Sequence, residues 1–342
     1  MSIFKCTKYQ NSFSTMQSLS NHFSNAHLAL LFIILLGVSC TKETIPLVEI
    51  TPKSSIILIG NNLGSRMLNY GYFETEMHLR FPNDSLIIRN MCDGGDTPGF
   101  RPHSSRNTPW AFPGAEKFQI ELTKSTGSDG VFEYPDEWLN RLDADIILAF
   151  FGYNESFEGE EGLPNFQSEL QAFITHTKSQ RYNEKSSPEL VLISPIAFED
   201  RSDDYDLPNG VSQNRNLKLY AEAMKTIALN NEVSYIDVYN PSAQWYENDD
   251  LTIDGSQLNE TGYQKFSNYI ADVLTGNKKA TIEDRRTALN EAVNEKNFFW
   301  HNDYKIPNGV HANGRRYAPF GPDNYPYEIQ KTREMTAIRD TA

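Results

Sequence analysis

The stretch Asp145-Ile146-Ile147-Leu148-Ala149-Phe150-Phe151-Gly152 decides the fold of this 342-residue chain. Between the aspartate and the glycine it is a short, unbroken apolar run. A second run of this kind, Ser55 to Gly60 (SIILIG), also ends in glycine. Runs of this length and composition are typical of strands that are buried on both faces of a parallel sheet.

Working outward from these two runs, strands and helices alternate along the chain. Three further strands are predicted at Leu86–Met91, Leu190–Pro195 and Val233–Tyr239. Helical spacing of apolar residues predicts helices at Leu63–Phe81, Glu137–Leu142, Pro164–Gln180, Gln213–Leu229 and Asn259–Leu274. Alternation of this type predicts a flavodoxin-like three-layer α/β/α sandwich around a five-stranded parallel sheet. Ligands of such folds bind at the carboxyl ends of the strands.

The composition narrows the class of function. Hydrophobic residues make up 39% of the chain and charged residues 22%, as in globular proteins. A formal net charge of −14 argues against a nucleic-acid partner, which requires a basic surface. No His-x-His or His-x₃-His spacing occurs, so we expect neither a metal ion nor a cofactor.

The N-terminus carries an export signal. Leu28 to Val38 is an apolar run of signal-peptide length, and it ends in Gly37-Val38-Ser39-Cys40. This ending resembles a bacterial lipobox, although Gly37 replaces the usual leucine. The resemblance implies that residues 1–39 are removed and that Cys40 is diacylated. The protein would then be an exported lipoprotein, anchored in the membrane on the periplasmic side or at the cell surface. A plain signal peptide or an uncleaved anchor is the alternative.

Four short blocks carry the chemistry, and each is expected at the end of a predicted strand. The blocks are Gly60-Asn61-Asn62-Leu63, Gly94-Gly95-Asp96-Thr97, Gly152-Tyr153-Asn154-Glu155 and Asp254-Gly255-Ser256-Gln257-Leu258-Asn259. In this order they resemble the motifs of the SGNH (GDSL-type) esterases. The resemblance covers residues 54–276, with an insertion at 97–126, and implies the SGNH hydrolase fold. Residues 40–53 would form a linker.

The resemblance also implies roles for individual residues. Gly95 and Asn154 match the oxyanion hole, and Asp254 matches the acid that orients the catalytic histidine. Asn62, however, occupies the position of the nucleophilic serine, and Gln257 that of the histidine. A carboxamide is neither a comparable nucleophile nor a base near neutral pH. The chain therefore has the frame of an ester hydrolase without its usual Ser–His pair.

Other interpretations of these residues stay open at the level of sequence. Asn62 and Asp254 are good helix N-caps, and Gly95 suits a tight turn. Cys92 could serve as a nucleophile with His103 as its base, or it could be a buried free cysteine. Ser65 lies inside the predicted helix and is a poor substitute for the missing serine.

Attack by water is a further alternative. The carboxylates Asp96, Glu155 and Asp254 are all expected near one cleft, where paired acids can raise one another's pKa.

Two segments lie outside the alternating core. The insertion at 97–126 is a candidate substrate-binding loop. Its candidate contacts, together with Glu155, are Arg101, His103, Arg106, Trp110 and Phe112. The C-terminal extension at 277–342 contains a predicted helix at Ile282–Trp300, a Pro-, Gly- and Tyr-rich stretch and a final helical segment. It ends at Ala342 without a glycine or proline stop signal.

Three functions are compatible with these observations. The first is a hydrolase of esters, such as acylated carbohydrate, with altered or weak catalysis. The second is an inactive pseudo-hydrolase that binds a carbohydrate or another ligand in the retained cleft. The third is a structural partner domain in a larger exported assembly.

The lipobox makes a prediction about anchoring. Replacing Cys40 with serine removes the thiol that would be acylated, so Cys40→Ser should move the protein from the membrane fraction to the soluble fraction. Cell fractionation with immunoblotting measures this. Unchanged fractionation would exclude a lipid anchor at Cys40.

Overall fold

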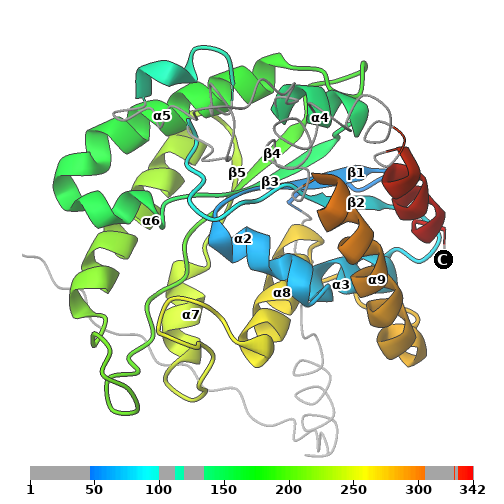
Figure 1. Cartoon of the computed structure of the whole chain (residues 1–342). Helices are drawn as coiled ribbons and strands as arrows, with labels where there is room; N and C mark the ends of the chain where they lie inside the picture. The colour runs from blue at the N-terminus through cyan, green and yellow to red at the C-terminus, as the bar shows by residue number, and fades with distance from the viewer. Residues whose placement is uncertain (1–46, 100–111, 119–134, 305–326, 328–329, 342) are drawn as a thin grey trace, which may run out of the picture. The chain divides into compact units, whose positions relative to one another are not determined.

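The computed structural model describes residues 47–99, 112–118, 135–304, 327 and 330–341 (Figure 1). The residues of the expected signal peptide, Cys40, most of the 97–126 insertion and the Pro-, Gly- and Tyr-rich stretch lie outside these residues. The described residues belong to a single compact unit. None of the helices described is both long and apolar enough to cross a bilayer.

The described unit is built on a five-stranded parallel sheet. Its strands are β1 (Ser55–Gly60), β2 (Ile87–Asn90), β3 (Ile146–Phe150), β4 (Glu189–Ile193) and β5 (Ser234–Ile236). They lie in the order β2-β1-β3-β4-β5, and every neighbouring pair is parallel. This is the flavodoxin-like strand order, and the predicted fold class is confirmed.

Helices cover both faces of the sheet (Figure 1). One face carries α4 (Pro135–Arg141), α5 (Gly159–Ser179) and α6 (Val211–Asn230). The other carries α3 (Tyr72–Arg80) and α8 (Glu260–Leu274). Two core clusters result, one on each side of the sheet.

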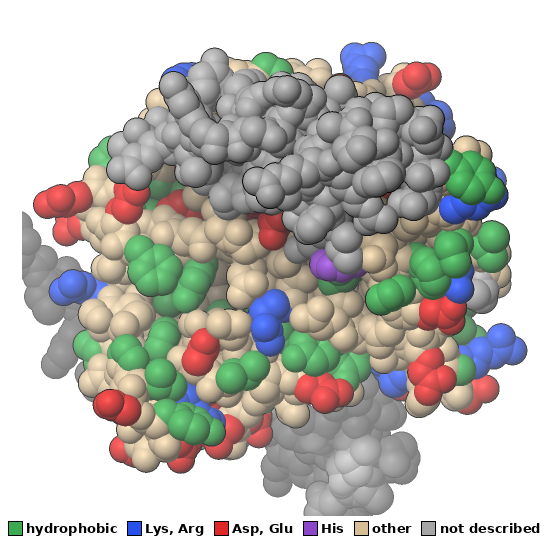
Figure 2. All heavy atoms as spheres, in the orientation of Figure 1, with side chains coloured by type: hydrophobic (Ala, Val, Ile, Leu, Met, Phe, Trp, Pro, Cys, Tyr) green, Lys and Arg blue, Asp and Glu red, His purple; other side chains and the backbone are tan. Residues whose placement is uncertain are grey.

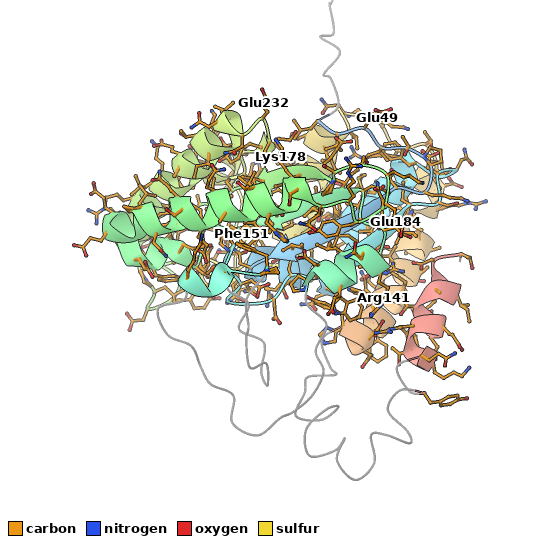
Figure 3. All side chains as sticks on the ribbon, turned by 90° about the horizontal axis from the view of Figure 1, so that it is seen from above. Glu49, Arg141, Phe151, Lys178, Glu184 and Glu232 are labelled. Carbon is orange, nitrogen blue, oxygen red and sulfur yellow. The ribbon has the colours of Figure 1, made fainter. Side chains whose placement is uncertain are left out.

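Strand β3 shows why the apolar run is continuous. Ile147 and Phe151 belong to the core under α5 and α6, whereas Ile146 and Phe150 belong to the core under α3 and α8. In the view from above, Phe151 lies beneath α5 (Figure 3), and its ring meets that of Phe173 edge to face at 5.2 Å. Alternate side chains enter opposite cores, so no position of the strand can be polar.

The predicted helix Leu63–Phe81 is wrong as a single element. It is divided into α2 (Asn62–Arg66), a 3₁₀ turn at Met67–Asn69, and α3. Gly71 breaks it with a φ of 65°, and a Cβ at this position would lie 2.7 Å from Oδ1 of Asn294. The chain bends here because another helix occupies the adjacent space, which helical spacing alone cannot indicate.

The fifth strand is shorter than predicted. β5 ends at Ile236, and an unpredicted helix α7 (Tyr239–Trp245) follows. The hydroxyl of Ser194 accepts hydrogen bonds from the N–H groups of Val238 (2.9 Å) and Tyr239 (3.1 Å). These two N–H groups therefore do not pair with a neighbouring strand. The chain beyond Ile236 turns away from the sheet.

The C-terminal helix α9 (Arg286–Tyr304) covers the edge strand β2. Lys296 donates to the carbonyl of Ile88 (3.1 Å), and the Trp300 indole donates to that of Asn90 (2.7 Å). Such carbonyls are unpaired at the edge of a sheet and would otherwise require water or another strand. The extension thus closes one edge of the α/β unit.

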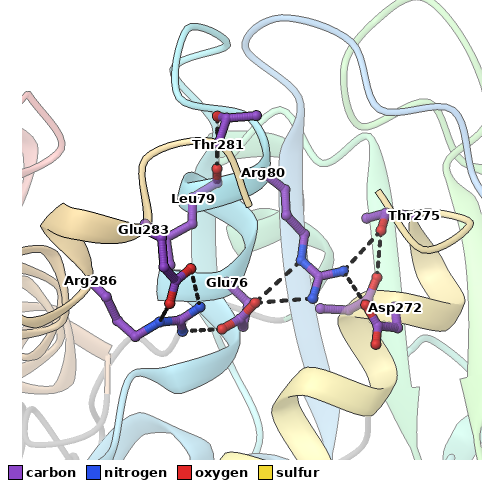
Figure 4. Close-up of polar contacts among 9 residues, drawn as sticks. Glu76, Leu79, Arg80, Asp272, Thr275, Thr281, Glu283 and Arg286 are labelled. Carbon is purple, nitrogen blue, oxygen red and sulfur yellow. Dashed lines mark hydrogen bonds and ion pairs between the residues drawn. The ribbon is translucent and has the colours of Figure 1, made fainter. Parts of the chain in front are cut away.

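Ion pairs attach α3 to its neighbours (Figure 4). The Glu76 carboxylate, 3% exposed, accepts from Arg80 at 3.0 Å and also from Arg286 of α9. Arg80 donates in turn to Asp272 of α8 at 2.7 Å. Within this group Glu76 and Arg80 are buried and each has a partner of opposite sign, which is the condition under which burying charge is tolerated.

The buried pair Lys296–Glu74 makes a prediction about stability. Their atoms are 2.8 Å apart, and the side chains are 3% and 9% exposed. Burial raises the pKa of Glu74, but Lys296 and His78 outweigh it and lower that pKa to about 2. Lys296→Met would leave a buried carboxylate without its main partner and should destabilise the protein by about 3–5 kcal/mol.

Urea denaturation measures the change, with Lys218→Met as the matched control. Lys218 lies on the surface, 4.0 Å from Glu222, so its loss should cost less than about 0.5 kcal/mol. The double variant Lys296→Met/Glu74→Gln should recover part of the loss. Equal effects of Lys296→Met and Lys218→Met would contradict the buried pairing.

Candidate active site

The ends of strands β1 to β4 and one loop form a cleft with a volume of ≈ 280 Å³. Asn62 follows β1, Gly95 follows β2, and Tyr153 and Asn154 follow β3. The loop before α8 supplies Ser256 and Gln257, and these six residues all line the cleft. Segments far apart in sequence meet here because parallel strands end at one edge of the sheet.

Asn62 is directed to the cleft. The alternative that it caps the following helix is wrong, because the cap of α2 is Asn61, whose Oδ1 accepts from the N–H of Leu63 at 3.1 Å. Asn62 is the first residue of α2, and a Cβ on Gly94 would lie 3.8 Å from its Oδ1. Its carboxamide faces the Gly94–Gly95 turn across the cleft.

The turn between β1 and α2 requires a glycine. Gly60 has a φ of 125°, and a Cβ at this position would lie 2.1 Å from the carbonyl oxygen of Phe150. That oxygen accepts from the N–H of Asn61 at 2.9 Å. The close approach of β1 to β3 fixes where Asn62 stands relative to Asn154.

The two candidate oxyanion elements are attached to each other. Gly95 has a φ of 89°, a conformation that glycine adopts without strain. Next to it, the carbonyl of Asp96 accepts a hydrogen bond from Nδ2 of Asn154 at 2.9 Å. An asparagine amide has two N–H donors, so one is left for a ligand in the cleft.

Asp254 organises its own loop. Its Oδ1 accepts from the N–H groups of Ser256 (2.9 Å) and Gln257 (2.8 Å), and its Oδ2 accepts from Nε2 of Gln257 at 2.9 Å. Partial burial on its own raises the pKa of Asp254, but these bonds outweigh it and lower the pKa below the ordinary value. The alternative that Asp254 caps a helix is wrong, since Asn259 caps α8 by accepting from Gly262 at 2.9 Å.

The Gln257 side chain is held in place by Asp254. Because its Nε2 donates to Asp254, its Oε1 is the atom left for the cleft. Asp254 therefore holds Gln257 as the same acid would hold a histidine. The amide presents a neutral hydrogen-bond acceptor and has no proton-accepting nitrogen near neutral pH.

A residue that the sequence analysis missed supports this loop. Glu199 is 3% exposed, and its carboxylate accepts from the N–H groups of Leu251 (3.1 Å) and Thr252 (2.7 Å) and from the Thr252 hydroxyl. Its own N–H donates to the carbonyl of Gly255 at 2.8 Å. In the sequence, only its position shortly after the predicted strand Leu190–Pro195 indicated that Glu199 lies near the cleft.

Glu155 lies behind the cleft rather than in it. It was expected to contact substrate, but it is 8% exposed, and its Oε2 accepts from the N–H of Gly152 at 2.9 Å. Burial, together with the neighbouring carboxylates Glu169 and Glu158, raises its pKa to about 8. The side chain braces the turn that presents Asn154.

Other sequence candidates lie away from the cleft. Cys92 is fully buried, and a Cβ on Gly64 of α2 would lie 2.5 Å from its sulfur. Phe112 was expected to stack on a ligand, but it is 5% exposed and stacks on His176 at 5.2 Å, so this expectation is wrong. The remaining candidates of the insertion, Arg101, His103, Arg106 and Trp110, lie outside the described residues.

The chemistry of the cleft follows from these contacts. Among the described residues that line it, the polar side chains are carboxamides and hydroxyls, and none is an acid, a histidine, a lysine or an arginine. Among the described residues, no group of three or more His, Cys, Asp or Glu is placed to hold a metal ion. The cleft can donate and accept hydrogen bonds, but it offers no nucleophile–base pair of the Ser–His type.

Comparisons with known proteins gave structural neighbours only. No family model and no curated protein matches the chain. A gut microbial diltiazem-metabolizing enzyme is 14% identical with a TM-score of 0.48 over 68% of this chain and 48% of its own, so the chain spans about half its length. An acetyl-xylooligosaccharide esterase, Axe2 from Geobacillus, is 11% identical with a TM-score of 0.45 over 66% of this chain and 96% of its own. An acetyl xylan esterase, AlAXEase, is 17% identical with a TM-score of 0.43 over 64% and 97%.

The buried Glu155 makes a prediction about pH. Its pKa is about 8 in the folded protein against 4.5 for the ordinary side chain, so folding favours its protonated form. The stability it contributes is complete below pH 4.5 and is lost as the pH rises through about 8. Glu155→Gln keeps a neutral acceptor for Gly152 and should remove this loss, stabilising the protein at pH 9 but hardly at pH 5.

Thermal unfolding of both proteins at several pH values measures this difference. Glu160→Gln, at an exposed position on α5, is the matched control and should change the pH dependence much less. A constant difference between Glu155→Gln and wild type from pH 5 to pH 9 would mean that the carboxyl is already ionised at pH 5.

Proposed function

We propose that this cleft binds an ester-bearing ligand, such as an acylated carbohydrate, and holds it without serine-hydrolase turnover. The observation that carries the proposal is the hydrogen bond from Gln257 to Asp254. Asp254 is the acid that would orient a catalytic histidine, and here it accepts a hydrogen bond from the Gln257 amide instead. Asn62 lines the same cleft.

The binding half of the site is retained. The backbone at Gly95 and the Asn154 amide lie on one wall of the cleft, and Asn154 is fixed by its bond to Asp96. Fixed neutral donors suit an ester carbonyl oxygen, which is a hydrogen-bond acceptor. Asn62 and Gln257 add further amide groups to the lining of the cleft.

Asn62 and Gln257 stand where the reactive serine and histidine would be, so the described residues of the cleft supply no Ser–His pair. Loss of the nucleophile or base from a comparable triad costs on the order of 10⁶ in kcat. Asp254 does not replace the base, because its hydrogen bonds lower its pKa and favour the anion that is already bonded to its own loop. A cleft with binding groups and no activated nucleophile is suited to retention of the ligand.

A weak hydrolase is the second candidate, and one observation favours it. Ser256 lines the cleft, and its hydroxyl donates to Oδ1 of Asp254 at 3.0 Å. This is a nucleophilic oxygen beside a carboxylate. Activation would be slight, because a carboxylate with a lowered pKa is a poor proton acceptor.

The expected export signal gives the proposal a location. A lipid anchor at Cys40 would hold the cleft on the periplasmic side of the membrane or at the bacterial cell surface. There it could present a bound carbohydrate to other members of an exported assembly.

Restoring the missing pair tests the proposal. Wild-type protein should hydrolyse p-nitrophenyl acetate at the background rate, whereas Asn62→Ser/Gln257→His should exceed it by roughly 10²-fold or more. Adding Asn154→Ala to that double variant should lower its rate by roughly 10²- to 10³-fold, because an oxyanion donor is lost.

Single variants serve as controls, since neither Asn62→Ser nor Gln257→His alone completes the pair. Wild-type turnover that Ser256→Ala abolishes would reject retention without turnover and establish the weak hydrolase. A double variant that folds, by circular dichroism, but stays at background would show that the cleft does not place an ester at Asn62.

A further inference from the structure

We propose that Tyr153 and Phe157 form an aromatic subsite at the rim of the cleft, on which the ring face of an uncharged sugar packs. This inference rests on the proposed function and specifies the ligand class of the same cleft. Three features of the described residues support it.

The first feature is the exposure of Phe157. Its side chain is 72% exposed, whereas Phe150 and Phe151, just before it in the sequence, are each 1% exposed. Its ring lies 5.4 Å from that of Tyr153 at an interplanar angle of 89°, and Tyr153 lines the cleft. The exposed aromatic surface is therefore continuous with the cleft wall.

Local structure explains why Phe157 points outward. A 3₁₀ turn, η3 (Glu155–Glu158), follows Asn154, and the buried Glu155 faces its inner side. Gly159, with a φ of 61°, then leads into α5. The turn that buries Glu155 and presents Asn154 thus also places Phe157 at the surface.

The second feature is the chemistry of the cleft. Asn62, Asn154 and Gln257 are carboxamides, and Ser256 is a hydroxyl. These groups both donate and accept, as sugar hydroxyls do. A pyranose presents hydroxyls at its rim and C–H groups on its face, and the negative face of an aromatic ring attracts C–H groups weakly. An amide-lined cleft beside two aromatic rings matches both parts of a sugar.

The third feature is charge. Glu158, Glu160 and Glu161 follow Phe157 and are exposed, and the whole chain carries a net charge of −14. Acidic side chains are also spread over the face drawn in Figure 2. Anionic sugars such as uronates would be repelled at this rim, so the subsite favours a neutral sugar.

The experiment is calorimetric titration of the full-length protein with O-acetylated xylotetraose as the neutral probe. Wild type should bind it, and Phe157→Ala should weaken binding by about 10-fold, since a stacking contact of about 1.4 kcal/mol is lost. Phe157→Tyr should retain binding. Phe298→Ala is the matched control, because Phe298 is 64% exposed on α9 and does not line the cleft.

Two further probes test the charge argument. Glucuronic acid oligosaccharides should bind much more weakly than the neutral probe, and equal affinity would overturn the preference for an uncharged sugar. Choline tests the competing possibility that the aromatic pair holds a cation. Choline binding that Phe157→Ala removes, with no binding of the neutral probe, would overturn the sugar subsite.

The outcome can be separated from that of the proposed function. If Asn62→Ser/Gln257→His hydrolyses p-nitrophenyl acetate but the neutral probe does not bind, the sugar inference fails and the ester cleft stands. If the folded double variant is inactive and the probe does not bind, the proposed function has failed as well.

Discussion

The whole structure depends on burial of β3 between two cores. Its side chains alternate between the core under α5 and α6 and the core under α3 and α8. Neighbouring parallel strands on both sides pair its backbone groups. This central position brings the ends of β1 and β3 together, with a contact at Gly60 that no larger residue would allow. Asn62 and Asn154 lie near each other because of that contact.

Charge is used in two different ways in this molecule. At the β2 edge, Lys296 and Glu74 are buried together, and the helix that carries Lys296 also satisfies strand carbonyls. Near the cleft, Glu199 and Asp254 accept backbone N–H groups and shape a loop. For Glu74 and Asp254 these donors lower the pKa of the carboxyl group, which favours its ionised form and removes it from acid–base chemistry.

The described lining of the cleft therefore combines fixed hydrogen-bonding positions with neutral groups. Gln257 is bonded to Asp254 in the way that a histidine would be, so the loop conformation survives without the base. The Asn154 amide is fixed independently through Asp96. The contacts that position these side chains thus do not require a nucleophile or a base, so the positions can be kept when the reactive groups are replaced. That separation is the physical basis for regarding the cleft as a binding site.

The sequence by itself determined the parallel α/β sandwich, because doubly buried strands must be continuously apolar and their connections must cross over. It also placed the polar blocks at strand ends. Only the tertiary structure decided that Asn61 rather than Asn62 caps α2, that Glu155 points inward, and that Gly71 divides a helix. Each of these depends on which atoms from distant segments occupy the neighbouring space. Local periodicity carries no information about such neighbours.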